Sequence, residues 1–182
     1  MFDLDQFIAD CEAAVAADGG QRGVREAMAR VVSDRASLIA RLGEPKRAGI
    51  ELLHRSKTVT ILNLVWGPHM TVMPHNHHMW AVIGIYGGRE DNIFWRTLPS
   101  DAKWPIEAAR ASSLMPGDSC PLGKDIIHSV TNPLGKLTGA LHVYGGDFLK
   151  QEREEWHEES LECAPYDSAK ARRLFEESNA RL

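Results

Sequence analysis

The sequence is poor in cysteine, and the few cysteines that it has are not arranged in pairs. Cys11, Cys120 and Cys163 are odd in number, widely spaced and in no CxxC motif. This pattern argues against a disulfide framework and predicts free thiols. Long apolar runs are also missing, so no segment approaches a membrane span, and the first residues lack the basic flank and apolar core of a secretion signal. The cytoplasm is therefore the expected location.

An excess of positive charge is absent as well. The 182 residues include 21 lysines and arginines against 25 aspartates and glutamates, which gives a net charge of −4, and there is no basic run. A nucleic-acid or acidic-membrane partner therefore has little electrostatic support, and a small molecule is the expected partner. The composition, 43% hydrophobic and 25% charged, predicts one globular domain over residues 1–182 with a sizeable core.

The chain up to residue 148 contains two regions that differ in the spacing of their apolar residues. Residues 1–45 have helical spacing and predict two helices, separated at Gly19-Gly20. Residues 50–148 consist of short segments rich in β-branched and aromatic residues between turn signals, which predict an antiparallel barrel or jelly roll with an all-β core. The expected strands are 58–66, 79–86, 90–95, 126–130 and 137–144.

The last part of the chain returns to a helical pattern. Residues 165–181 predict a C-terminal helix that begins after Asp167, because aspartate is a preferred N-cap residue. The acidic stretch from Glu152 to Glu159 before this helix predicts a solvated face.

Two segments carry histidines in a pattern typical of metal ligands. In Pro74-His75-Asn76-His77 the side chains of an extended strand alternate faces, so His75 and His77 point the same way and can hold one ion. By the same alternation His78 points to the opposite face. His128 follows a Pro-Gly-Asp turn in another expected strand and supplies a third imidazole. The sequence therefore predicts a metal site made of three histidines.

These residues carry a resemblance to a known family. The segments PHNHHMWAVIGIYGG, MPGDSCPLG and IIHSVTN resemble the two metal-binding motifs of the cupin superfamily, which implies a double-stranded β-helix fold. The glutamate usual in the first motif is missing, because Met79 to Val82 contains no acid. An all-histidine cupin of this kind is similar to thiol dioxygenases of the cysteine dioxygenase type, and LNLVWGP and LHVYGGD agree with the bacterial branch of that family. The resemblance covers roughly Leu52 to Phe148.

The resemblance implies roles for individual residues. His75, His77 and His128 match the three ligands of a mononuclear iron site, so the expected cofactor is Fe(II), with Ni, Mn or Zn as alternatives in purified protein. His142 and Tyr144 match the last two members of a Ser-x-His-x-Tyr triad and are the expected catalytic residues.

The chain also departs from the pattern of that family. Ala140 stands where the triad has serine, so the relay loses a hydroxyl unless Thr138 or water replaces it. The arginine that grips a substrate carboxylate has no clear counterpart, and Arg55 is the nearest candidate for substrate binding. Glu90 is not expected to replace the missing metal carboxylate, because it lies thirteen residues from His77.

The donor set itself points to a type of chemistry. Three neutral imidazoles leave the double charge of the ion uncompensated, so the site favours an anionic substrate. A thiol near such an ion loses its proton, and open positions can take thiolate and dioxygen side by side. The expected function is therefore a mononuclear non-haem iron dioxygenase that oxidises a small thiol to a sulfinate. The alternatives are a metal-binding or small-molecule-binding cupin without turnover, and a cupin dioxygenase that acts on a non-thiol.

Overall fold

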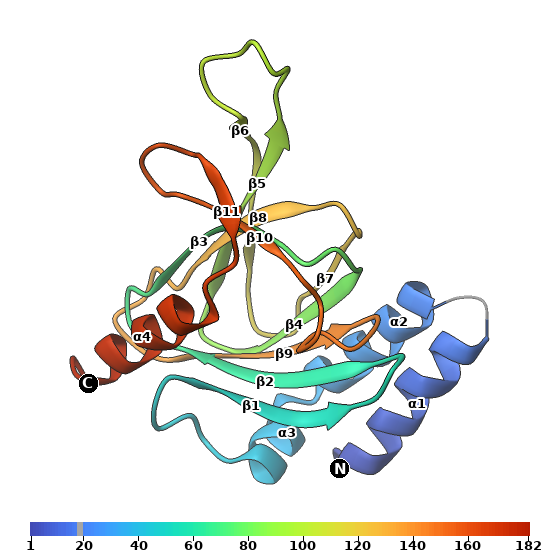
Figure 1. Ribbon diagram of the computed structural model, residues 1–182. Helices are drawn as coiled ribbons and strands as arrows, with labels where there is room; N and C mark the ends of the chain where they lie inside the picture. Colours follow the sequence, from blue (N-terminus) through green and yellow to red (C-terminus); the bar gives the residue numbers. More distant parts are fainter. Residues whose placement is uncertain (18–19) are drawn as a thin grey trace.

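The computed structural model describes residues 1–17 and 20–182, and the strands in this part of the chain form two antiparallel sheets (Figure 1). The elements before the sheets are α1 (Leu4–Ala16), α2 (Gly20–Ser33) and α3 (Arg35–Leu42). The strands are β1 (Gly49–Arg55), β2 (Thr60–Trp66), β3 (Thr71–Asn76), β4 (Ala81–Gly87), β5 (Glu90–Thr97), β6 (Ile106–Leu114), β7 (Ser119–Leu122), β8 (Ile127–Thr131), β9 (Thr138–Tyr144), β10 (Glu154–Trp156) and β11 (Cys163–Pro165). The last element is α4 (Ser168–Asn179).

The order of the strands in these sheets confirms the predicted fold class. One sheet has the order β1-β2-β9-β4-β7 and the other has the order β11-β10-β3-β8-β5-β6. Apart from β1–β2, β5–β6 and β10–β11, neighbours in each sheet are not consecutive in the chain, as in a jelly roll whose two sheets face each other. The interior is filled by side chains that both sheets contribute, among them Leu62, Val72, Ile83, Phe94 and Val130. The molecule therefore has the double-stranded β-helix of the cupin fold.

A second core joins the N-terminal helices to the outer face of the five-stranded sheet. Phe7 of α1, Met28 of α2 and Leu38 of α3 are buried together with Val82 of β4 and Leu141 of β9. In α2 the buried residues Val24, Met28 and Val32 recur every four positions, so this helix buries one apolar stripe against the sheet. Figure 1 shows the three helices on the side of the molecule that carries β1, β2, β4 and β9.

The prediction of two N-terminal helices was wrong, because the region contains three. Asp34 divides the second predicted helix: its side chain accepts a hydrogen bond from the Ser37 amide at 3.1 Å and begins α3. Aspartate at this position satisfies an amide that would otherwise lack a partner. The predicted break at Gly19-Gly20 falls partly on Gly19, which lies outside the described residues, while Gly20 begins α2.

The C-terminal segment returns to the barrel. Asp167 caps α4 as predicted, because its Oδ1 accepts hydrogen bonds from the amides of Ala169 and Lys170. The predicted solvated face before this helix was wrong in its centre. Glu155 and Trp156 are 7% and 4% exposed, because β10 adds to the edge of the six-stranded sheet beside β3. Within the described residues, no helix is long and apolar enough to cross a membrane.

The helix α4 is held against the five-stranded sheet by both ring stacking and hydrogen bonds. The ring of Phe175 stacks on Trp66 of β2 with centroids 5.6 Å apart. The side-chain amide of Asn179 donates to the carbonyl of Ala48 at 2.9 Å and accepts from its amide at 2.7 Å, just before β1 begins. The helix is therefore fixed across one side of the space between the sheets.

Candidate metal centre

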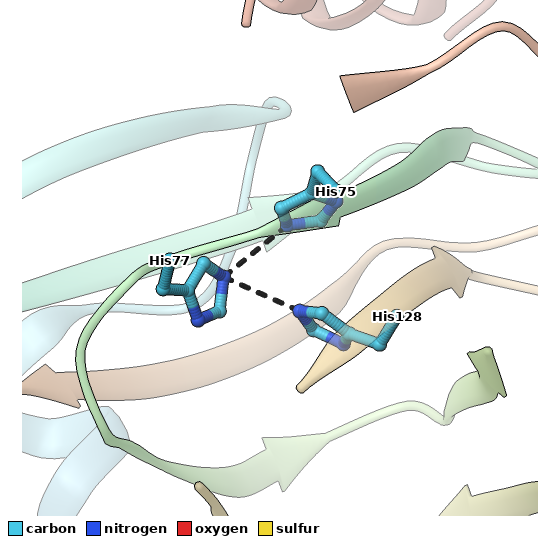
Figure 2. Close-up of side chains that lie close together, drawn as sticks. All are labelled: His75, His77 and His128. Carbon is cyan, nitrogen blue, oxygen red and sulfur yellow. Dashed lines mark hydrogen bonds between the residues drawn. The ribbon is translucent and has the colours of Figure 1, made fainter. Parts of the chain in front are cut away.

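Two neighbouring strands bring the three predicted histidines together. His75 on β3 lies directly opposite His128 on β8 in the antiparallel register, and facing residues of paired strands are close neighbours. His77 follows the end of β3 by one residue and still points to the same space. Figure 2 shows the three rings directed toward one another, with Nε2 of His77 3.2 Å from Nε2 of His75 and 3.3 Å from Nε2 of His128. The predicted alternation is therefore confirmed for this pair.

His78 takes another direction, as the alternation predicts. Its backbone has a φ of 51°, which turns the chain away after β3. Its Nε2 lies 3.3 Å from a carboxylate oxygen of Glu154, and its side chain is 38% exposed. The group of residues that can share an ion contains His75, His77 and His128, and within the described residues no carboxylate joins it.

The hydrogen bonds of two rings leave their Nε2 atoms free for a metal. Nδ1 of His75 lies 2.9 Å from the carbonyl oxygen of Met73, and Nδ1 of His128 lies 2.8 Å from Oδ1 of Asn92. An oxygen of either kind only accepts hydrogen bonds, so Nδ1 carries the proton in both rings. The lone pair of Nε2 then points toward the shared centre, and outer partners of this kind are typical of metal-ligating histidines.

Burial keeps these imidazoles in the neutral form that binds metals. His75, His77 and His128 are 6%, 3% and 1% exposed. Burial lowers the pKa of His75 from 6.5 to about 4. It lowers the pKa values of His77 and His128 well below 6.5, and the neighbouring histidines add to the effect. All three rings are therefore neutral at pH 7 without a metal.

The spacing of the rings fits an ion of the first transition row. Ligand nitrogens about 2.1 Å from such an ion lie about 3.0 Å apart at a right angle and about 3.4 Å apart at the tetrahedral angle. The observed separations of 3.2 and 3.3 Å fall between these values. Three imidazoles suit iron, nickel, copper or zinc, so the geometry supports a metal ion without selecting one.

A cavity of about 700 Å³ extends from the histidines to the outside. It lies between the sheets, with residues of β2, β3, β8, β9 and α4 in its wall. His142 and Tyr144 on β9 line it, are 2% and 3% exposed, and are joined by a contact of 3.1 Å between Nδ1 and the phenol oxygen. The edge of the Tyr144 ring lies against His77, with centroids 5.1 Å apart. The two predicted catalytic residues therefore lie beside the metal centre.

The hydroxyl of Thr138 does not replace the missing serine of the triad. It contacts the carbonyl oxygen of Arg89 and Oδ1 of Asn132, each at 3.1 Å. Nε2 of His142 instead faces a carboxylate oxygen of Glu90 at 3.6 Å. Glu90 is not a member of the three-histidine group, in agreement with the sequence argument, but it is fully buried and bonded to Asn92, which contacts His128.

Arg55 lies away from the position that the substrate-binding prediction requires. Its guanidinium forms a two-pronged ion pair with the carboxylate of Asp147, at 2.8 and 3.1 Å, and it is not among the residues that line the cavity. A β-bulge between Leu52 and His54 shifts the register of β1 before Arg55.

Arg153 lines the cavity instead, and sequence analysis did not find it. Its guanidinium lies between two rings, 4.0 Å from the centroid of Phe148 and 4.2 Å from that of Tyr166. The positive charge helps to lower the pKa of His77, after burial and the other two ligands. Among the described residues no carboxylate forms an ion pair with Arg153. The only signal in the sequence is an arginine placed alone within an acidic stretch.

Comparisons with known proteins add a set of similar solved structures, while no family model matches the chain. An RmlC-like cupin from Methanocaldococcus jannaschii is 13% identical with a TM-score of 0.48, over 59% of this chain and 87% of that one. A cupin superfamily protein from Desulfitobacterium hafniense is 16% identical with a TM-score of 0.46, over 60% and 88%. The DMSP lyase DddQ from Ruegeria pomeroyi is 17% identical with a TM-score of 0.48, over 62% of this chain and 53% of that one. The strand order of the two sheets defines the cupin fold of this chain, and its three histidines form a group that can bind a metal ion.

Proposed function

We propose that the protein is a mononuclear non-haem iron dioxygenase that oxidises a small, negatively charged thiol to a sulfinate. The observation that supports this most directly is the cavity that holds three neutral imidazoles and an arginine without a carboxylate partner among the described residues. The resemblance to thiol dioxygenases in the histidine motifs supports the same reaction.

The donor set explains why a thiolate would be drawn to this site. No carboxylate neutralises part of the metal charge, so an anionic sulfur offers the missing compensation. Bound iron(II) would supply the redox chemistry that brings thiolate and dioxygen to react. The reaction R–S⁻ + O₂ → R–SO₂⁻ is balanced: two sulfur–oxygen bonds form, the O–O bond breaks, and the four electrons lost by sulfur are gained by the two oxygen atoms. No additional reductant is required.

Arg153 is suited to bind the other end of the substrate. A guanidinium binds a carboxylate through two parallel hydrogen bonds, and the flanking rings of Phe148 and Tyr166 hold its plane in one orientation. Burial lowers the pKa of Arg153, yet an arginine remains charged at neutral pH. A thiol that also carries a carboxylate would therefore be held by both of its ends.

His142 and Tyr144 are suited to handle a proton beside the reacting atoms. Burial raises the pKa of Tyr144, so its phenol keeps its proton at neutral pH and can donate a hydrogen bond to developing negative charge. The ring of Phe148 stacks on Tyr144 with centroids 3.8 Å apart, which limits the movement of the phenol. The hydroxyl is therefore held at the wall of the cavity.

Oxygen consumption by protein loaded with Fe(II) tests the proposal. Uptake should occur with thiols that carry a carboxylate, such as 3-mercaptopropionate, and the product should be the sulfinate. No uptake with any thiol would refute the proposal. Uptake with ring or diketone substrates alone would indicate a non-thiol cupin dioxygenase, and ligand binding without uptake would indicate a binding protein.

A pair of variants tests the role of Arg153. Arg153→Gln should raise KM for carboxylated thiols by about 10-fold to 100-fold, because a charge-assisted contact contributes about 1.5–3 kcal/mol. It should change KM much less for cysteamine, which lacks the carboxylate. Arg172→Gln is the matched control, since Arg172 is exposed on α4 and lines the same cavity. Equal effects of Arg153→Gln on both thiols would contradict the carboxylate contact.

A further inference from the structure

A buried carboxylate connects the metal ligands to the proposed acid–base pair. Glu90 at the start of β5 is 0% exposed, and its carboxylate meets three groups. Oε2 accepts a hydrogen bond from Nε1 of Trp66 at 2.7 Å and faces Nε2 of His142 at 3.6 Å, and Oε1 accepts from Nδ2 of Asn92 at 2.9 Å. Among the described residues no lysine or arginine forms an ion pair with Glu90. A buried polar group is costly unless it has hydrogen-bond partners, and Trp66 and Asn92 supply one to each oxygen of this carboxylate.

The contact with Asn92 determines the proton position on a metal ligand. Nδ2 of Asn92 donates to Oε1 of Glu90, so the Asn92 amide turns its NH₂ group toward this carboxylate. Its oxygen then faces Nδ1 of His128 at 2.8 Å. That nitrogen must be the donor, which leaves the lone pair of Nε2 free for the metal. Glu90 therefore selects the metal-binding tautomer of His128 through one intermediate amide.

The contact with His142 acts on the second histidine. Nε2 of His142 is fully buried and lacks a hydrogen-bond partner within 3.5 Å among the described residues. The oxygen of Glu90 is the polar atom that it faces, at 3.6 Å. The carboxylate favours a proton on Nε2, so Nδ1 is left to face the phenol of Tyr144 at 3.1 Å. Ala140, two residues before His142 on β9, has no hydroxyl that could perform this task.

We propose that Glu90 is a positioning residue that sets the proton positions on His128 and His142 together. In this chain it takes the place of the hydroxyl that Ala140 lacks, and it couples the metal centre to the acid–base pair. The second part rests on the proposed function, because it assigns His142 to proton handling. The first part concerns the metal-binding group alone.

The first experiment measures the affinity of the purified protein for Co²⁺, by competition with a chelator, in Glu90→Gln. Glutamine has one accepting and one donating end, so it cannot accept from both Trp66 and Asn92. If the NH₂ group of the new glutamine faces Asn92, the Asn92 amide flips and turns its own NH₂ group toward Nδ1 of His128. Nδ1 must then accept, so the proton of His128 moves to Nε2, the nitrogen that would bind the metal. We expect a 10-fold to 100-fold loss of Co²⁺ affinity, the range typical of outer partners of metal ligands. An affinity within twofold of wild type would overturn the proposal.

Two further variants separate this effect from a general loss of charge or stability. Asp91→Asn removes the same charge from the adjacent residue, which pairs with Arg89 and is 29% exposed, and should leave Co²⁺ affinity unchanged. Asn92→Ala removes the amide that links Glu90 to His128, so Glu90→Gln should lower Co²⁺ affinity less than threefold further in that background. Full additivity of the two losses, or an equal loss in Asp91→Asn, would contradict transmission through the amide.

Nitrogen-15 NMR of the histidine rings tests the same proposal first in the wild-type protein and then in variants. In metal-free wild type, His128 should carry its proton on Nδ1 and His142 on Nε2, and a neutral His128 with its proton on Nε2 would overturn the inference. In Glu90→Gln, addition of Ala140→Ser should return the proton of His142 to Nε2 without restoring Co²⁺ affinity. A His142 signal unchanged by Ala140→Ser would overturn the claim that Glu90 replaces a hydroxyl. These readouts require no turnover, so a failure of thiol oxidation is distinguishable from a failure of this inference.

Discussion

The metal-free protein should lose stability on mild acidification, because it buries neutral histidines. The pKa of His75 is 6.5 in the unfolded chain and about 4 in the native state. Between these values the unfolded chain binds more protons than the native state, so the free energy of unfolding falls as the pH falls. The full difference corresponds to about 3 kcal/mol, and about 2 kcal/mol of it is lost at pH 5. The stabilisation is fully present above pH 6.5.

Urea unfolding of metal-free protein at pH 7.5 and at pH 5 measures this effect. A loss of about 2 kcal/mol lowers the urea midpoint by about 1 M, for a typical dependence of about 2 kcal/mol per molar urea. His77 and His128 act in the same direction, since their pKa values are also lowered by burial. The observed shift should therefore exceed the value for His75 alone.

The variant His75→Gln isolates the contribution of one ring. It lacks the group that titrates, so its stability relative to wild type should improve by about 2 kcal/mol between pH 7.5 and pH 5. If wild type and variant lose stability in parallel over this range, the reasoning is refuted. The same burial affects metal occupancy. Histidines with an ordinary pKa would lose metal below about pH 6.5, whereas these buried rings should lose it only at the lower pH at which they protonate.

Other parts of the structure lead to further predictions. His77→Ala should lose most bound metal and His78→Ala should keep it, as metal analysis of the purified variants will show; equal loss would contradict the observed directions of the two side chains. Gly84→Ala should destabilise the protein by about 1–3 kcal/mol, because its Cβ would lie 2.4 Å from Sδ of Met28 where α2 crosses β4. Gly49→Ala is the control, since its Cβ would meet no atom within 4 Å, and equal thermal shifts of the two variants would argue against close packing of α2.

The histidine ligands could be predicted from the sequence because their geometry is mainly local. His75 and His77 share a face because residues two positions apart in an extended chain point the same way. His128 needed a long-range step, and the motif resemblance supplied it. The structure shows the physical basis: His128 is the register partner of His75 across β3 and β8. The histidine motifs in the sequence and the register of β3 and β8 in the structure therefore agree at this site.

Arg153 and Glu90 could not be predicted in the same way, since their positions depend on pairing between distant segments. Arg153 reaches the cavity because β10 pairs with β3 at the edge of the six-stranded sheet. Glu90 lies near His142 because β5 and β9 face each other from opposite sheets. Neither arrangement leaves a periodic trace in the sequence. The position of Arg55 also depends on a distant segment, because its guanidinium pairs with the carboxylate of Asp147.

The arrangement around Arg153 separates two properties of the site along the chain. The three histidines that can bind a metal ion lie on or directly after barrel strands between positions 75 and 128, whereas Arg153, Tyr166 and Phe175 come from the segment after β9, which includes α4. Changes in that later segment can alter which molecules enter the cavity while the metal ligands stay untouched. Access to the cavity and affinity for a metal are therefore separable targets for evolution and for protein engineering, and the boundary between them lies near Phe148.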